Sequence, residues 1–213
     1  MKPKAIIFDK DGVLADSEKL KATAWQQTLE PLGVQDGYGW YLRELGPSSV
    51  ALATLAMETF SLDGDPEAIA QEWDHRYRAI EGAAEPIRDN LEILAHLSQG
   101  YAIAVASSMD QTSIVAELMR FGYRDYVEAC VSGEDVANNK PAPDVYIKAA
   151  ACLGVEPAEC VAVEDSPTGV RAAKDAGIYC VGFKNPLYDL DLSEADLIAT
   201  DLTRVDFANL LDS

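Results

Sequence analysis

Short, almost wholly apolar runs recur along the chain and alternate with longer stretches whose apolar residues are three or four positions apart. The apolar runs occupy residues 5–8, 101–107, 126–132, 160–165, 178–183 and 196–200. Helical spacing separates them at residues 88–98, 110–120, 143–153 and 166–176. Strands that are apolar on both faces and alternate with helices are typical of a parallel sheet covered by helices on both sides. The pattern therefore predicts an α/β fold with a parallel sheet.

Residues 16–85 interrupt this alternation. Helical spacing dominates them, as in "SSVALATLAMETF", and no run among them has the character of a buried strand. A helical insertion of this size between the first and second strands predicts a separate small domain with hinges near residues 15–17 and 84–88. We therefore expect a core domain of residues 1–15 and 86–213 and a helical domain of residues 16–85.

Composition and charge exclude several classes of partner. The chain has 213 residues, of which 48% are hydrophobic and 25% are charged, as in soluble globular proteins. Its formal net charge of −19 argues against binding to nucleic acid or to an anionic membrane surface, since both require a positive face. No apolar stretch approaches the ~20 residues needed to span a bilayer, and the N-terminal apolar run is too short for a signal peptide. We expect a cytoplasmic protein that is a monomer or a weak homodimer.

Charged and hydroxyl side chains follow the apolar runs where strands are expected to end, and a lysine precedes the helix that begins near Pro143. These residues are Asp9, Asp11, Ser107, Ser108, Lys140, Glu164 and Asp165. The carboxyl ends of parallel strands meet at one edge of a sheet, so we expect these side chains to lie together. Neighbouring carboxylates repel one another, which predicts a cation or proton at this edge. Strand alternation turns Lys10 away from the site, toward the surface or the helical domain.

Each of these residue types has a role in phosphoryl transfer. A carboxylate can attack phosphorus to form an aspartyl-phosphate. Mg²⁺ prefers oxygen ligands, which suits Asp9, the backbone carbonyl of Asp11 and Asp165. Lys140 and the Ser107 hydroxyl can neutralise and hydrogen-bond the phosphate oxygens. Asp11 is placed to protonate the leaving alkoxide and then to deprotonate the attacking water.

Four segments in chain order, "FDKDGVLADSE", "VASS", "NKPAPDVY" and "VEDSPTGVRAAKDAG", resemble the four motifs of the haloacid dehalogenase (HAD) superfamily. The resemblance covers residues 4–15 and 86–183, and the position of the helical insertion is also similar. It implies a Rossmann-like core, a C1-type helical cap formed by residues 16–85, and Mg²⁺-dependent phosphoryl transfer. The similarity is to the phosphoglycolate phosphatase and β-phosphoglucomutase branch.

The resemblance also implies roles for single residues. Asp9 corresponds to the nucleophile and Asp11 to the acid/base. Ser107 and Lys140 correspond to phosphate-binding residues, and Ser108 joins them through a backbone or capping contact. The alternatives are that Ser107 caps a helix and that Lys140 is a solvated loop lysine.

For the metal, the resemblance implies Asp9, Asp11 and Asp165 as ligands, with Glu164 assisting. Two simpler interpretations stay open at this stage. Asp165 would cap the helix that follows it, and Glu164 would contact the other ligands instead of the metal.

A phosphatase is the preferred activity, and a sugar phosphomutase is the alternative. Mutases of the β-phosphoglucomutase kind carry a histidine in the first cap helix, where this chain has Lys21. They also carry an arginine in a cap loop, and the corresponding loop "ELGPSS" at residues 44–49 has none. Dehalogenases lack the second aspartate of the pair, Asp11. A non-catalytic binding protein of the same fold would be expected to have lost a core carboxylate or the lysine, and neither is missing.

The cap is expected to select the substrate, because the core offers only generic phosphate contacts. The candidate residues are Lys21, Trp25, Arg43 and Ser48, and the alternative for each is a packing or surface role. A pocket under a compact helical cap suits a small phosphorylated metabolite, such as a sugar phosphate or phosphoglycolate. Closure of the cap would exclude water until the aspartyl-phosphate has formed.

Overall fold

The protein is described here by a computed structural model, which covers residues 2–212. The chain divides into two compact units. One consists of Met1–Ala15 and Pro86–Ser213, and the other of Asp16–Glu85. That the second unit acts as a cap stays a prediction.

The first unit is built around a six-stranded sheet with the strand order β5-β4-β1-β6-β7-β8. Every neighbouring pair of strands in it is parallel. The strands are β1 (Ala5–Phe8), β4 (Ala102–Ser107), β5 (Ala129–Ser132), β6 (Cys160–Glu164), β7 (Tyr179–Phe183) and β8 (Leu197–Ala199). The predicted α/β fold with a parallel sheet is thereby confirmed. The expected strand at 126–132 begins only at Ala129, because Arg124–Tyr126 forms a 3-10 turn.

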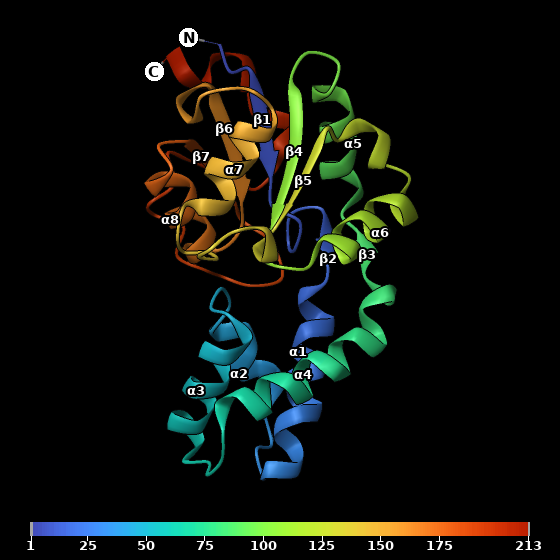
Figure 1. The fold of residues 1–213 in the computed structure, drawn as a ribbon, viewed down its shortest axis with the longest axis vertical. Helices are drawn as coiled ribbons and strands as arrows, with labels where there is room; N and C mark the ends of the chain where they lie inside the picture. Colours follow the sequence, from blue (N-terminus) through green and yellow to red (C-terminus); the bar gives the residue numbers. More distant parts are fainter. Residues whose placement is uncertain (1, 213) are drawn as a thin grey trace. The chain divides into compact units, whose positions relative to one another are not determined.

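Helices cover both faces of this sheet (Figure 1). One face packs against α5 (Arg88–Leu97) and α6 (Gln111–Phe121), with Leu91 and Ile114 in the shared core. The opposite face packs against α7 (Asp144–Cys152) and α8 (Pro167–Asp175). Side chains of β1 alternate between the two cores, which is why all four of its residues are buried.

The second unit consists of helices α1 (Glu18–Leu29), α2 (Gly37–Arg43), α3 (Ser49–Phe60) and α4 (Pro66–Ile80). Its interior contains an aromatic cluster, formed by Trp25, Trp40, Tyr41, Phe60, Trp73 and Tyr77. Trp25 contacts three of these rings, at centroid distances of 5.6, 6.4 and 5.5 Å. Burial of large aromatic side chains is a strong source of stability, so this cluster holds the helices together.

Several short elements complete the fold. The strands β2 (Ala15–Asp16) and β3 (Glu85–Pro86) form a two-stranded sheet. The 3-10 helices are Glu30–Leu32, Glu81–Ala83, Arg124–Tyr126, Gly133–Asp135, Pro157–Glu159, Leu202–Arg204 and Phe207–Asp212. Within residues 2–212, no helix has both the length and the apolar character that a membrane crossing requires.

Candidate active site

The central strands of the sheet bring the polar residues together. The strand β1 lies between β4 and β6, with Phe8 in register with Val105 and Val163. Asp9 follows β1, Ser107 ends β4 and Glu164 ends β6, so the three residues meet at one edge. All three side chains are buried. The expected convergence of strand ends is thus present in the structure.

Lys140 lies among the carboxylates at this edge. Its Nζ atom is 2.5 Å from Oδ1 of Asp9 and 2.6 Å from Oε1 of Glu164, and it also donates to the Ala106 carbonyl at 3.1 Å. Burial would lower the pKa of Lys140, but the carboxylates of Asp9 and Glu164 outweigh it and raise this pKa above its usual value. Lys140 is therefore a permanent cation at the site and is not a solvated loop residue.

Asp9 has an unusual electrostatic environment. Its pKa is raised from 3.8 to about 7, chiefly by burial and also by the charges of Glu164 and Asp11, while the attraction of Lys140 lowers it in part. A carboxyl group in this position is readily protonated near neutral pH unless a further cation lies beside it. The local charge balance therefore favours cation binding.

Glu164 is hydrogen-bonded through both of its oxygens. Oε1 accepts from Lys140 and from the Tyr146 hydroxyl, the latter at 2.7 Å. Oε2 accepts from the backbone N–H of Asp165 at 3.1 Å and from the Ser166 hydroxyl at 3.2 Å. A Cβ atom on Gly169 would overlap this carboxylate, so the first turn of α8 requires glycine there. Glu164 is the most firmly fixed of the acidic groups in the cluster.

Asp11 is held between a serine and a lysine. The Ser107 hydroxyl donates to Oδ2 of Asp11 at 3.2 Å, and Nζ of Lys10 is 3.2 Å from Oδ1. Lys10 also forms a buried ion pair with Glu117 on α6. The expectation that Lys10 faces the surface or the helical unit is wrong, because its side chain is only 2% exposed and turns toward α6.

Ser107 and Ser108 have different surroundings. The Ser107 Oγ atom accepts from the backbone N–H of Met109 at 3.1 Å, in addition to its bond to Asp11. Ser108 is exposed, and its hydroxyl donates to Oδ1 of Asn139 at 3.0 Å. The same amide oxygen accepts from the backbone N–H of Lys140 at 2.8 Å. Asn139 therefore links the loop that carries Ser108 to the loop that carries Lys140. The expected roles of these serines in phosphate binding stay predictions.

Three carboxylates are placed to share a metal ion. Asp9, Glu164 and Asp165 each offer one oxygen, and the three oxygens lie within 4.8 Å of one another. All three residues are buried. An all-oxygen set of this kind suits a hard cation such as Mg²⁺. The donor set thus fits the metal that the family resemblance implies. Asp165 does not cap α8, because the cap is Ser166, whose side chain accepts a hydrogen bond from the Gly169 N–H.

Two of the four proposed specificity residues have structural roles in the helical unit. Trp25 is 0% exposed, at the centre of the aromatic cluster. The hypothesis that it contacts substrate is at odds with this burial, because its ring is enclosed by other rings. The Ser48 side chain accepts from the backbone N–H of Ala51 and caps α3.

The other two residues are polar contacts of the same unit. Lys21 forms an ion pair with Glu18 at 2.8 Å, and Glu18 accepts a second hydrogen bond, of 2.5 Å, from the Tyr41 hydroxyl. Arg43 is largely exposed and lies 3.6 Å from Asp36. Lys21 is therefore the more buried of the two cations, and the role of both residues in specificity stays a prediction.

Sequence reasoning missed several residues at the strand-end site, namely Glu117, Asn139, Tyr146, Asn185 and Tyr188. A signal existed for Glu117, because it follows Ile114 by three positions and therefore shares the buried stripe of α6. A carboxylate on an apolar stripe needs a buried partner, which Lys10 supplies. For Tyr188, on the loop after β7, no periodicity or motif indicates a contact with Asp165.

The fold and the site define an α/β enzyme with an acidic centre and one buried lysine at its strand ends. Residues 6–183 match the haloacid dehalogenase-like hydrolase family, and the chain belongs to this family. The family resemblance of its four motifs is thereby confirmed.

The relatives of the chain include phosphatases and a phosphomutase. Fructose-1-phosphate phosphatase YqaB from Escherichia coli (strain K12) is 30% identical over 177 residues, which cover 83% of this chain and 94% of the relative. Beta-phosphoglucomutase from Bacillus subtilis (strain 168) is 31% identical over 193 residues, with coverages of 84% and 82%. The crystal structure of CbbY from Rhodobacter sphaeroides in complex with phosphate is 26% identical, with a TM-score of 0.80 and coverages of 99% and 100%. These findings support the expected class of enzyme, a phosphoric monoester hydrolase.

Proposed function

We propose that the protein is a Mg²⁺-dependent phosphatase that hydrolyses a small phosphorylated sugar through an aspartyl-phosphate on Asp9. The observation that carries the proposal is the buried cluster in which Lys140 contacts Asp9 and Glu164 while Asp165 completes a set of oxygen ligands. Buried carboxylates in excess of buried cations require a further positive charge. A divalent cation held by these carboxylates fits that requirement, and with Lys140 it would also attract the phosphate group of a substrate.

The first chemical step is attack by a carboxylate oxygen of Asp9 on phosphorus. A bond forms between that oxygen and phosphorus, and the bond from phosphorus to the ester oxygen breaks. A metal held by Asp9, Glu164 and Asp165 would supply positive charge that offsets the repulsion between the carboxylate and the phosphate. Lys140 and the Ser107 hydroxyl are placed to stabilise the charge that develops on the phosphoryl oxygens.

Asp11 supplies the proton transfers. Its carboxyl group gives a proton to the leaving alkoxide and then takes one from the water that attacks the aspartyl-phosphate. The second step releases inorganic phosphate and regenerates Asp9. The contacts of Asp11 with Ser107 and Lys10 support this role, because they hold both of its oxygens in a defined orientation.

The proposed substrate class rests on the relatives and on the helical unit. Fructose-1-phosphate phosphatase YqaB is named for a sugar phosphate. We assign the helical unit the role of a cap that selects the sugar, with the partly buried Lys21 as its candidate cation. A small phosphorylated sugar requires positive charge only where its phosphate binds, so the net negative charge of the chain is compatible with such a substrate.

A sugar phosphomutase is the second candidate, because Beta-phosphoglucomutase from Bacillus subtilis is as similar to the chain as the phosphatases are. A mutase must hold two phosphate groups at once. Lys21 stands where mutases of this kind carry a histidine, and the loop at residues 44–49 has no arginine for the second phosphate. These two differences favour hydrolysis.

The test is release of inorganic phosphate from a panel of sugar phosphates, phosphoglycolate and an aryl phosphate, with and without Mg²⁺. Asp9→Asn should lose activity by at least about a thousandfold, because removal of a nucleophile abolishes the covalent route. Asp125→Asn, which makes the same change at an exposed position of the same unit, should match the wild type. EDTA should abolish activity and added Mg²⁺ should restore it.

Two outcomes would contradict the proposal. Absence of phosphate release from the whole panel, in the presence of Mg²⁺, would rule out this phosphatase activity. Conversion of glucose 1-phosphate to glucose 6-phosphate, dependent on a bisphosphate primer and faster than hydrolysis, would establish the mutase instead.

A further inference from the structure

The loop between β7 and β8 reaches the proposed metal site through Tyr188. We propose that Tyr188 is a positioning residue, whose hydroxyl holds the Asp165 carboxylate in the orientation that a divalent cation requires. The inference rests on the proposed function, because that function assigns Asp165 to the metal. It adds a residue that lies outside the four motifs and outside the helical unit.

The contact itself is direct. The Tyr188 hydroxyl donates a hydrogen bond to Oδ2 of Asp165, a residue that is 5% exposed. Gly12 confirms how closely these groups pack, since a Cβ atom there would overlap both Oδ2 of Asp165 and the Tyr188 hydroxyl oxygen. Gly12 also has a φ of +78°, which favours glycine. The turn after Asp11 therefore leaves room for the hydroxyl and the carboxylate together.

The loop that carries Tyr188 is attached to the first motif by a second contact. The Asn185 side chain is buried, and its amide donates to the Gly12 carbonyl at 2.9 Å. Its amide oxygen accepts from the backbone N–H of Leu187 at 3.0 Å, which turns the chain toward Tyr188. Asn185 and Tyr188 thus fix the loop at two points, one on the first motif and one on the fourth.

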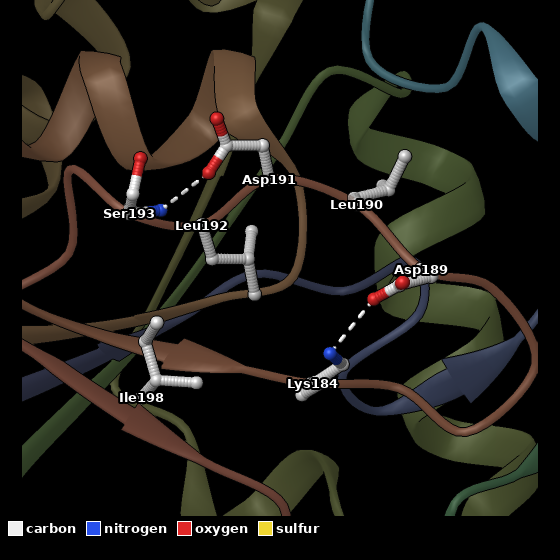
Figure 2. Close-up of a pocket in the computed structure, with 7 residues that line it drawn as sticks. All are labelled: Lys184, Asp189, Leu190, Asp191, Leu192, Ser193 and Ile198. Atoms are coloured by element: carbon white, nitrogen blue, oxygen red, sulfur yellow. Dashed lines mark hydrogen bonds and ion pairs between the residues drawn. The ribbon is translucent and has the colours of Figure 1, made fainter.

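Polar contacts support the part of this loop around Tyr188, while Leu192 further along packs into the core of the unit. Figure 2 shows the ion pair between Lys184 and Asp189, whose Nζ and Oδ1 atoms are 2.7 Å apart. This pair joins the residues on either side of the turn that contains Tyr188. A cavity of about 390 Å³ lies beside it, and its apolar lining is formed by Leu190, Leu192 and Ile198.

The chemistry of a carboxylate permits both contacts at once. An ionised carboxylate has about four lone-pair positions, so a hydrogen bond at Oδ2 leaves positions for a metal. Asp9 is fixed by Lys140, and Glu164 is fixed by Tyr146 and Ser166. Tyr188 gives Asp165 a corresponding support. Groups that hydrogen-bond the ligands of a metal orient them, and their loss typically weakens metal binding by about 10- to 100-fold.

The experiment measures Mg²⁺ binding directly, by titration calorimetry on the full-length protein at constant pH. Tyr188→Phe removes only the hydroxyl and should raise the dissociation constant for Mg²⁺ by about 10- to 100-fold. Tyr126→Phe is the matched control, because Tyr126 lies in the same unit with 39% of its surface exposed. It should bind Mg²⁺ as the wild type does. Circular dichroism and thermal unfolding without metal will show whether each variant is folded.

A second readout separates positioning of the ligand from general support of the fold. At subsaturating Mg²⁺, Tyr188→Phe should lose activity, and excess Mg²⁺ should restore kcat with the KM for the phosphate ester unchanged. A merely structural role would leave the half-saturating Mg²⁺ concentration where it is in the wild type.

The possible failures are distinguishable. If Tyr188→Phe binds Mg²⁺ within about threefold of the wild type, or more tightly, the role of Tyr188 is refuted while the proposed function stands. If the wild type itself shows no saturable Mg²⁺ binding, the metal site of the proposed function fails, and the positioning role fails with it.

Discussion

The two units of the protein bury different kinds of side chain. In the α/β unit, charged groups are buried together at the ends of the central strands, namely Asp9, Lys140, Glu164 and Asp165. In the helical unit, the interior is apolar and includes stacked and edge-on aromatic rings around Trp25. A buried carboxylate of that unit, Glu18, has both of its oxygens occupied by Lys21 and Tyr41.

The difference separates the parts of the chain that provide stability from those that provide chemistry. A buried charge is unfavourable unless it is paired, and several carboxylates around one lysine are incompletely neutralised. Such a cluster persists because the surrounding strands and helices stabilise the fold, and it is suited to bind a cation and an anionic substrate. An aromatic cluster gains stability from burial alone and needs no ligand. The helical unit can therefore vary its surface without disturbing its interior.

The largest expected effect is that of Lys140→Met, which removes the cation from the strand-end cluster. Two buried carboxylates, Asp9 and Glu164, would lose their ion pair, so the free energy of unfolding without metal should fall by about 3–5 kcal/mol. Phosphatase activity should also be lost. Chemical denaturation in EDTA measures the first effect. Lys148→Met is the control, because its ion pair with Asp135 is exposed and should be worth about 0–1 kcal/mol. Equal losses of stability for the two variants would show that the buried contacts of Lys140 contribute no more to stability than an exposed ion pair does.

A smaller effect is expected from pH, through Asp9. Its folded-state pKa is raised from 3.8 to about 7, so the folded chain holds this proton more tightly than the unfolded chain does. The stability that the proton contributes is complete below the unfolded pKa and is lost as pH rises through about 7. Without metal, the wild type should therefore lose roughly 2–3 kcal/mol relative to Asp9→Asn between about pH 5 and about pH 8.

Mg²⁺ should reverse this loss, because a cation beside Asp9 favours the ionised form. Denaturation curves of both proteins over that pH range, with EDTA and then with Mg²⁺, measure the difference. Parallel pH profiles for the wild type and Asp9→Asn without metal would show that Asp9 ionises normally in the folded chain.

Much of the α/β unit could be predicted, because its apolar pattern indicates where each strand lies in the sequence and at which edge of the sheet the strand ends. A strand that is apolar on both faces must lie inside a sheet, and the residue after its last apolar position must emerge at the carboxyl edge. Asp9, Ser107 and Glu164 were placed together on this ground alone. The position of Lys10 could not be predicted in this way. Alternation predicts the face of the strand on which a side chain lies, but not that Glu117 is a buried partner on that face.

The helical unit was less predictable for a related reason. Helical spacing predicts that one stripe is buried, yet it does not say which polar or aromatic residues near the edge of the stripe turn inward. Helical spacing left Trp25 as a candidate for substrate contact, but its ring lies inside the unit, where Trp40, Tyr41 and Trp73 surround it. The contact of Tyr188 with Asp165 joins loops 23 residues apart in sequence and has no periodic signal at all.

The smallest effect is expected from Lys21→Met, which makes the same kind of substitution in the helical unit. Glu18 would lose its ion pair with Lys21 but keep the hydrogen bond from the Tyr41 hydroxyl, and the aromatic interior would be unchanged. The free energy of unfolding should therefore fall by only about 1–2 kcal/mol, less than for Lys140→Met. Arg43→Met is the matched control, because its contact with Asp36 is exposed and its loss should change stability by less than about 0.5 kcal/mol. A loss for Lys21→Met as large as that for Lys140→Met would mean that the helical unit, too, depends on a buried charge, and the contrast between the two interiors would then not hold.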